Sequence, residues 1–280
     1  MYCHYYIQKD YRQKDHRQKD HRQKGFSLIE ILIAMAIASI LSLAMYSFNT
    51  NQTRSHVTQE AIVEMNQNVR AALHFMSSEI RMAGCDPSGD AGAGFLTNIS
   101  GYVTTPSSTA IAFSMDFTGG EADGIDNDGD GVVDDSRESY DGQCNSTGEM
   151  VRYRFDAGTN RILRGYWIND PGPLNPYTGW STDEELATAI DALNFVYLDE
   201  NGSVWPPAGG DPADIRTVQI TVVARSGTVL PGFMLTHRDP AANYQNQQND
   251  VIYTPPDEAA RKFRRIVLTA EVKVRNMGLM

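Results

Sequence analysis

Apolar and polar positions fall into three successive patterns along the chain. Between Phe26 and Phe48 most residues are apolar, and Glu30 is the only charged one. From Asn49 to Gly84 apolar residues recur at spacings of three and four, which is typical of an amphipathic helix. Beyond residue 85 several short runs alternate apolar and polar residues, which is typical of half-buried β-strands.

The first two patterns predict a single long helix, because residues 26–83 contain no glycine and no proline. Its apolar half, residues 26–48, is 23 residues long, and a membrane-spanning helix needs about 20. A carboxylate in such a segment costs roughly 2.5–3.5 kcal/mol at the middle of the bilayer and less near its surface. Glu30 therefore requires a functional explanation.

The second half of the helix, residues 49–84, carries an apolar stripe that needs a partner. Gly84, with Pro87 close behind it, predicts the end of the helix. We expect a β-sheet head to cover the stripe. A coiled-coil stalk is the alternative, and it is disfavoured because the stripe does not continue as a regular seam. The stripe consists of Val57, Ala61, Met65, Val69, Leu73 (or Ala72), Met76 and Ile80.

Residues 85–280 are long enough for one globular head. No regular alternation of strands and helices appears, so we expect a mostly antiparallel sheet and an α+β fold. Thr182–Glu185 has the spacing of a capping box and predicts a short helix to Ala192, and Asp199–Gly202 predicts a turn. The expected strands are Ala110–Asp116, Val151–Phe155, Arg161–Ile168, Leu193–Leu198, Ile215–Ala224 and Arg265–Val274.

Two stretches of the head are expected to be exposed loops. Residues 205–207 form one of them, and residues 226–262 form the other, with an Asn- and Gln-rich part from Tyr244 to Asn249. Contact with other subunits is the alternative to a plain loop in both places.

Residues 1–25 form a polar, repetitive leader that we expect to be unstructured. Seven Lys/Arg against three Asp give it a net charge of about +4, which places it in the cytoplasm by the positive-inside rule. The chain after residue 48 then lies outside the inner membrane. An uncleaved signal anchor is the plainest interpretation of this arrangement, because Gly25, the one cleavage-like residue, comes before the apolar run.

The sequence Gly25-Phe26-Ser27-Leu28-Ile29-Glu30 resembles the class III signal of type IV prepilins and of the pseudopilins of type II secretion. The resemblance implies cleavage between Gly25 and Phe26 by a prepilin peptidase, then N-methylation of Phe26. It also implies extraction of the helix into a filament by an inner-membrane assembly platform. Glu30 of one subunit then pairs with the new α-amino group on Phe26 of a neighbour, because two charges in low dielectric are tolerated only as a pair.

Parts of the head resemble PilW-type minor pilins and, more distantly, GspJ-type pseudopilins. The resemblance implies a type IV pilin-like fold and a minor pilin that helps to initiate assembly of a type IV pilus or sits at its tip. Its partners are then other minor and major pilins. A minor pseudopilin of type II secretion is one alternative, and a calcium-binding ectodomain on a permanent anchor is another. The resembling segments are Glu79–Gly84, Leu193–Asp199, Ile215–Ile220 and Arg275–Asn276.

Residues 123–135 form an Asp-rich loop with the ligand spacing of a calcium site. Carboxylate oxygens suit Ca²⁺ rather than Zn²⁺, since no Cys or His is interleaved. Arg137 stands where an EF-hand has its bidentate glutamate, so the loop resembles the Asp-rich calcium loops of extracellular proteins instead. A solvated acidic turn is the alternative. The candidate ligands are Asp123, Asp126, Asp128, Asp130, Asp134 and Asp135, with the main-chain carbonyl of Val132.

Cleavage after Gly25 would remove Cys3 and leave Cys85 and Cys144 in an oxidising compartment, where a disulfide between them is expected. Two free thiols are the alternative, and spacing alone does not decide between them. The mature chain would keep 17 basic and 32 acidic residues, a net charge of −15. We therefore expect no direct binding of nucleic acid, which requires basic patches.

The six histidines form no catalytic constellation, and no phosphate-binding loop, nucleophile elbow or zinc-protease motif occurs in the sequence. We therefore expect a structural subunit and not an enzyme.

Overall fold

The computed structural model describes residues 25–87, 92–97, 106–117, 124, 131–133, 143–145, 147–170, 177–206, 210–229 and 243–277. The chain divides into two compact units, Met1–Gln52 and Thr53–Met280, which are described separately here.

One helix, α1 (Leu28–Met82), contributes to both units. Its first turn is closed by the carbonyl of Ser27, which accepts hydrogen bonds from the backbone N–H groups of Glu30 (3.0 Å) and Ile31 (3.2 Å). It ends two residues before Gly84, whose φ of +74° is a left-handed conformation that favours glycine.

In the N-terminal unit every described residue up to Asn49 is exposed, including the large apolar side chains of α1. By length and composition, α1 is the one helix among the described residues that could cross a membrane. This unit therefore has no core of its own to cover its apolar surface, which suits hydrocarbon or other helices as its surroundings.

In the C-terminal unit one face of α1 is buried from Met65 onward, as the sequence predicts. Val57, the first residue of the predicted stripe, is still 41% exposed. The head therefore covers the stripe only from about the fourth helical turn of the C-terminal unit. The buried residues are Met65, Val69, Ala72, Leu73, Met76 and Ile80.

The strands of the described head are β1 (Ala110–Ser114), β2 (Met150–Asp156), β3 (Arg161–Asp170), β4 (Tyr177–Trp180), β5 (Glu184–Ala187), β6 (Ile190–Leu198), β7 (Thr217–Arg225), β8 (Tyr244–Gln245), β9 (Val251–Tyr253) and β10 (Arg265–Lys273), with short 3-10 helices at Pro212–Asp214 and Ala260–Lys262.

All strand pairs among the described residues are antiparallel, which confirms the α+β prediction. A five-stranded sheet has the order β1-β2-β3-β4, and β5 pairs with another part of β3. A three-stranded sheet has the order β10-β7-β6, and β8 and β9 form a hairpin.

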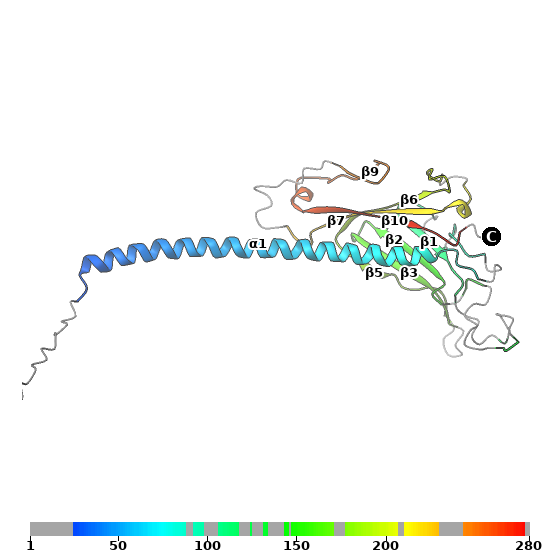
Figure 1. Ribbon diagram of the computed structural model, residues 1–280, viewed down its shortest axis with the longest axis horizontal. Helices are drawn as coiled ribbons and strands as arrows, with labels where there is room; N and C mark the ends of the chain where they lie inside the picture. The colour runs from blue at the N-terminus through cyan, green and yellow to red at the C-terminus, as the bar shows by residue number, and fades with distance from the viewer. Residues whose placement is uncertain are drawn as a thin grey trace, which may run out of the picture. The chain divides into compact units, whose positions relative to one another are not determined.

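Both sheets share one hydrophobic core with the stripe of α1. In the view of Figure 1, β7 and β10 lie on one side of this part of the helix and β3 and β5 on the other. Phe113 of β1, Tyr153 of β2, Ile162 of β3 and Ile220 of β7 are all fully buried in this core. Each large apolar side chain buried in this way contributes roughly 1.5–3 kcal/mol.

The two segments expected to be exposed loops are exposed in part: Pro206 and most described residues of 226–262 are exposed, and Pro207 and residues 230–242 lie outside the described residues. The prediction is wrong for the β8–β9 hairpin and for Trp205, which are packed.

The β8–β9 hairpin packs on the outer face of the three-stranded sheet, where Tyr244 joins Ala192 and Val223 in a second, smaller apolar cluster. Trp205 is 4% exposed, because its ring meets Tyr197 edge-on at 6.0 Å and its indole N–H donates to the carbonyl of Asp211.

The short helix expected after Thr182 is also wrong, since Glu184–Ala187 is strand β5. The acidic residues of the supposed capping box bind arginines across the sheet instead of helix N–H groups. Asp183 accepts hydrogen bonds from Arg152 and Arg154, and Glu185 pairs with Arg161 at 2.6 Å. Cross-strand pairing thus outweighs the local helical signal.

A carboxylate anchors the last turns of α1 to the five-stranded sheet. Glu79 accepts hydrogen bonds from the guanidinium of Arg164, at 2.7 and 3.1 Å, and from the hydroxyl of Tyr153. Burial, and next the negative charge of Glu79, raise the pKa of Tyr153 far above its usual value, so this hydroxyl stays a donor.

The three-stranded sheet contains a buried ion pair that links its edge strands β6 and β10. Asp191 lies 2.6 Å from Arg265, and the two side chains are 2% and 0% exposed. Arg225 approaches the other carboxylate oxygen at 3.4 Å.

We predict that Asp191→Ala lowers the free energy of unfolding by about 3–5 kcal/mol, because it removes the carboxylate that lies against the buried guanidinium of Arg265. Glu185→Ala is the matched control: it breaks the exposed pair with Arg161, and exposed pairs contribute about 0–1 kcal/mol. Chemical denaturation of the full-length variants measures both effects. Equal losses in the two variants would contradict the assignment of the buried pair.

Candidate processing and assembly site

The junction Gly25-Phe26-Ser27 precedes α1 and is exposed, with Phe26 at 81%. A Cβ added to Gly25 would meet no atom within 4 Å, and its φ is not in the left-handed region. Neither packing nor backbone conformation therefore requires glycine at this position. Recognition of this residue by another protein, such as a peptidase, would explain why glycine is present there.

Glu30 lies on one face of α1 together with Ala34 and Ala38, because these residues are four apart. With Phe26, Ile31 and Met35 they line a hollow along the helix. Small residues let helices approach closely in an apolar medium. This face therefore offers a neighbouring helix a close apolar contact with one carboxylate at its N-terminal end.

Residues 20–46 match the family model described as the prokaryotic N-terminal methylation motif. The chain carries this prepilin-type motif. It contains Gly25, Phe26 and Glu30, so the sequence resemblance at this junction has independent support. The match covers the beginning of the chain and says nothing of the head.

No curated protein sequence matches the chain. Among solved structures, the type IV-like pilin TTHA1219 from Thermus thermophilus is similar at 10% identity, with a TM-score of 0.38; the similarity covers 76% of this chain and 98% of that one.

The expected calcium ligands fall largely outside the described residues. Asp123, Asp126, Asp128, Asp130, Asp134 and Asp135 are not among them, whereas Val132 is described and is 51% exposed. In the described part of the chain, no group of three or more His, Cys, Asp or Glu could hold a metal ion. The calcium site therefore stays a prediction.

Cys85 and Cys144 are unbonded thiols in the structure, so the expected disulfide is not formed in it. They nevertheless share their surroundings at the end of β1. The carbonyl of Cys85 accepts a hydrogen bond from the N–H of Asp116 (2.7 Å), and the Cys144 thiol is hydrogen-bonded to Ser114. Burial, and then the carboxylates around them, raise the pKa of both thiols, that of Cys144 to about 11.

Glu79 is the residue whose role the sequence analysis missed. It appeared there only as part of a segment resembling a helix exit, whereas in the structure it fixes the helix to Tyr153 and Arg164. Its position next to Ile80, at the edge of the apolar stripe, was the available signal. A carboxylate beside a buried face needs a partner there.

Proposed function

We propose that this chain is a minor type IV pilin, a structural subunit that helps to initiate assembly of a type IV pilus or sits at its tip. One observation supports this above all others. A prepilin-type methylation motif leads directly into a helix whose apolar residues, from Leu28 to Phe48, are exposed and carry Glu30 as their only charge. Other pilin helices would cover that surface.

Removal of the leader by prepilin peptidase creates the charge that Glu30 needs. Cleavage after Gly25 leaves a cationic α-amino group on Phe26, and N-methylation keeps that charge. An isolated charge in hydrocarbon is costly, whereas a paired one is tolerated. Pairing between Glu30 of one subunit and Phe26 of the next favours one axial offset between helices, so the carboxylate sets the register of assembly.

The finer assignment rests on the short head segments that resemble PilW-type minor pilins. A minor pseudopilin of type II secretion is the second candidate, because the same processing signal and the resemblance to GspJ-type pseudopilins fit it equally. The proposed location is the inner membrane, with the leader in the cytoplasm and the head in the periplasm, and then the pilus. The genes beside this one would distinguish the two candidates.

Glu30→Ala is expected to leave membrane insertion and processing intact while removing the protein from the sheared pilus fraction. Breaking a buried pair by removing one partner costs about 3–5 kcal/mol, enough to exclude the subunit from a filament. Immunoblots of sheared pili and of membranes measure the two pools. Normal recovery of the variant in the sheared fraction would contradict the proposed role.

Gly25→Asp is the companion variant, because it acts on processing alone. A Cβ at this position meets no neighbouring atom, so the substitution leaves the fold unchanged. It should keep the leader and migrate at the size of the precursor. Migration at the processed size would instead favour a permanent membrane anchor that needs no cleavage.

We also propose that the Asp-rich loop binds Ca²⁺ as a structural ion. Six carboxylates within residues 123–135 repel one another without a cation. The ion would order a long connection between β1 and β2.

Calcium should raise the melting temperature of the full-length protein and give a binding heat in a calorimetric titration. Asp128→Asn with Asp130→Asn should remove both effects, since each change deletes a charged ligand. Asp257→Asn, at an exposed position in the C-terminal part of the head, is the control. A titration of the unmodified protein without heat or thermal shift would refute the site.

We further propose that Cys85 and Cys144 form a disulfide in an oxidising compartment, which would tie the exit of α1 to the far end of the Asp-rich loop. Their raised thiol pKa values make spontaneous oxidation slow at neutral pH, because the thiolate is the reactive form. An oxidase or disulfide exchange would then be needed.

Mass spectrometry of periplasmic protein, alkylated before reduction, should recover the two cysteines as one linked peptide pair. Recovery of both as alkylated thiols would show that the disulfide is absent.

A further inference from the structure

Strand β10 forms one edge of the three-stranded sheet, and no other described strand pairs with its outer side. Its nine residues pair with β7 in one unbroken register, and none of them is a proline. Natural proteins usually protect a long edge strand with a proline, a bulge or a covering segment, because its unpaired backbone groups can bind another strand. In the described part of the chain, β10 has none of these three protections.

The backbone groups of alternate residues of β10 point away from the sheet. The carbonyl of Arg264 accepts from the N–H of Ser226 at 2.8 Å, and the N–H of Val274 donates to the carbonyl of Arg216 at 3.0 Å. The even-numbered residues between these two contacts therefore face β7, since the direction alternates along a strand. The odd-numbered residues, whose N–H and C=O groups lie on the free edge, are Val267, Thr269, Glu271 and Lys273. In the described structure, none of their N–H groups has a hydrogen-bond partner.

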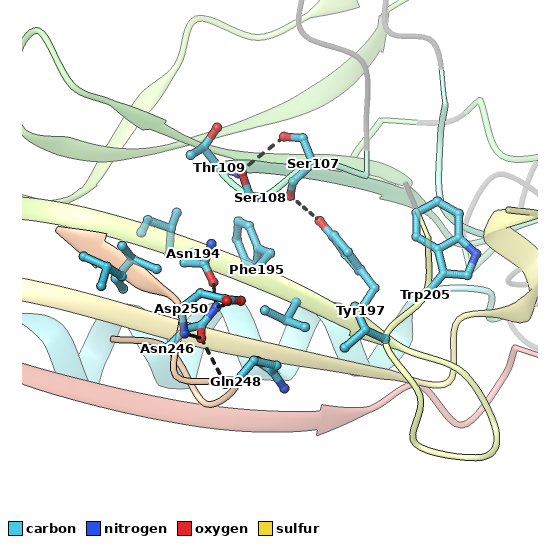
Figure 2. A pocket seen from close by; sticks show the side chains of 15 residues that line it. Ser107, Ser108, Thr109, Asn194, Phe195, Tyr197, Trp205, Asn246, Gln248 and Asp250 are labelled. Atoms are coloured by element: carbon cyan, nitrogen blue, oxygen red, sulfur yellow. Dashed lines mark hydrogen bonds between the residues drawn. The ribbon is translucent and has the colours of Figure 1, made fainter. Parts of the chain in front are cut away.

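The opposite edge of the same sheet is partly closed by other segments of the head. On β6 the N–H of Phe195 donates to the carbonyl of Ser108, and the carbonyl of Tyr197 accepts from the N–H of Trp205, both at 2.8 Å. Figure 2 shows Ser108 and Trp205 beside this strand. Of the two edges of this sheet, β10 is therefore the one that is open to another strand.

The side chains of β10 give its free edge an apolar side and an exposed side. Ile266, Leu268 and Ala270 are only partly buried where they border the main core. Val267, at 37%, and Thr269 are exposed on the other face. An added strand with apolar residues at alternate positions would extend the core beyond the first three residues, because the side chains of paired residues lie on the same face.

Basic residues flank this edge in a chain that is acidic as a whole. Residues 261–275 contain six Lys/Arg and one acid, Glu271, whereas the whole chain has a net charge of −11. Arg264 at one end and Lys273 and Arg275 at the other are exposed, and in the described structure they form no ion pair. Opposite charges across two strands stabilise their pairing, and like charges destabilise it. The charges at this edge thus favour a strand with acidic residues at both ends.

We propose that the free edge of β10 binds an extended acidic segment of another protein as an additional antiparallel strand. Backbone hydrogen bonds supply the affinity of such pairing, and alternate side chains supply its specificity. A nucleic acid fits less well, because its phosphates accept hydrogen bonds but donate none to the carbonyls of the edge. A second copy of this chain, paired through its own β10, would bring like charges together at both ends. The inference goes beyond subunit assembly, because none of these residues belongs to the methylation motif or to α1.

The test is binding of a fluorescent nonapeptide, Asp-Asp-Val-Thr-Val-Thr-Val-Asp-Asp, to the full-length protein in detergent, with affinity measured by fluorescence anisotropy. In the proposed pairing the valines lie beside Ile266, Leu268 and Ala270. The N–H groups of the threonines then face β10, and those of the valines face away. N-methylation of both threonines should lower the affinity at least about tenfold, since it removes two hydrogen bonds. N-methylation of two valines is the matched control and should leave the affinity unchanged.

Two sets of protein variants test the same edge. Thr269→Pro should weaken binding of the unmethylated peptide at least about tenfold, because it deletes an N–H that faces away from β7, where a strand tolerates proline. Thr269→Ala keeps that N–H and is its control. Arg264→Glu with Lys273→Glu should also weaken binding and reduce its dependence on salt. Arg70→Glu, at an exposed position of α1, controls for the change in net charge. Thermal melting shows whether each variant is folded.

The proposal is overturned if the peptide does not bind, or if methylated threonines weaken it no more than methylated valines. Equal affinity of folded Thr269→Pro and Thr269→Ala would also overturn it. Tighter binding of single-stranded DNA than of the peptide, lost in the Arg264→Glu and Lys273→Glu variant, would assign the edge to nucleic acid instead. Self-association of the protein that Thr269→Pro abolishes would assign it to a second copy.

Discussion

Burial of one stripe of α1 is the interaction on which the head depends. The stripe from Met65 to Ile80 enters a core that contains residues of both sheets. Without the helix, the apolar face of each sheet would therefore be left partly uncovered. Sheets with a single apolar face need such a cover. The apolar residues in the N-terminal part of the same helix are exposed. The change from a continuous apolar run to an apolar stripe in the sequence corresponds directly to this contrast between the two halves of the helix.

The long helix and six of the ten strands in the described part of the chain could be predicted from sequence, because they depend on local periodicity. The four other strands could not, since β4 and β5 divide the edge of β3 between them and β8 and β9 are very short. Their formation depends on long-range partners. Glu184 shows why: it lies in the segment Thr182–Glu185, whose spacing favours a helix start, yet Arg164 of β3 lies opposite it in the sheet. Tertiary pairing overrides such weak local signals.

The processing junction was the most predictable part of the candidate sites, because a short linear motif can be recognised from the order of its residues alone. Gly25, Phe26 and Glu30 could be chosen from the sequence, and the structure adds that nothing in the fold requires glycine at position 25. The contacts of Glu79 were not predictable. Its partners Tyr153 and Arg164 lie 74 and 85 residues away in the sequence, and only the folded head brings them together.

The way α1 is held in the head has a mechanical consequence. The contacts of the stripe run along the helix axis, and Glu79 adds charge-assisted bonds near its last turn. A pull along that axis would load these contacts in shear, so that they must fail together and not one after another. In a subunit anchored by its helix, tension would thus reach both sheets through the shared core, and the five-stranded sheet also through Arg164 and Tyr153.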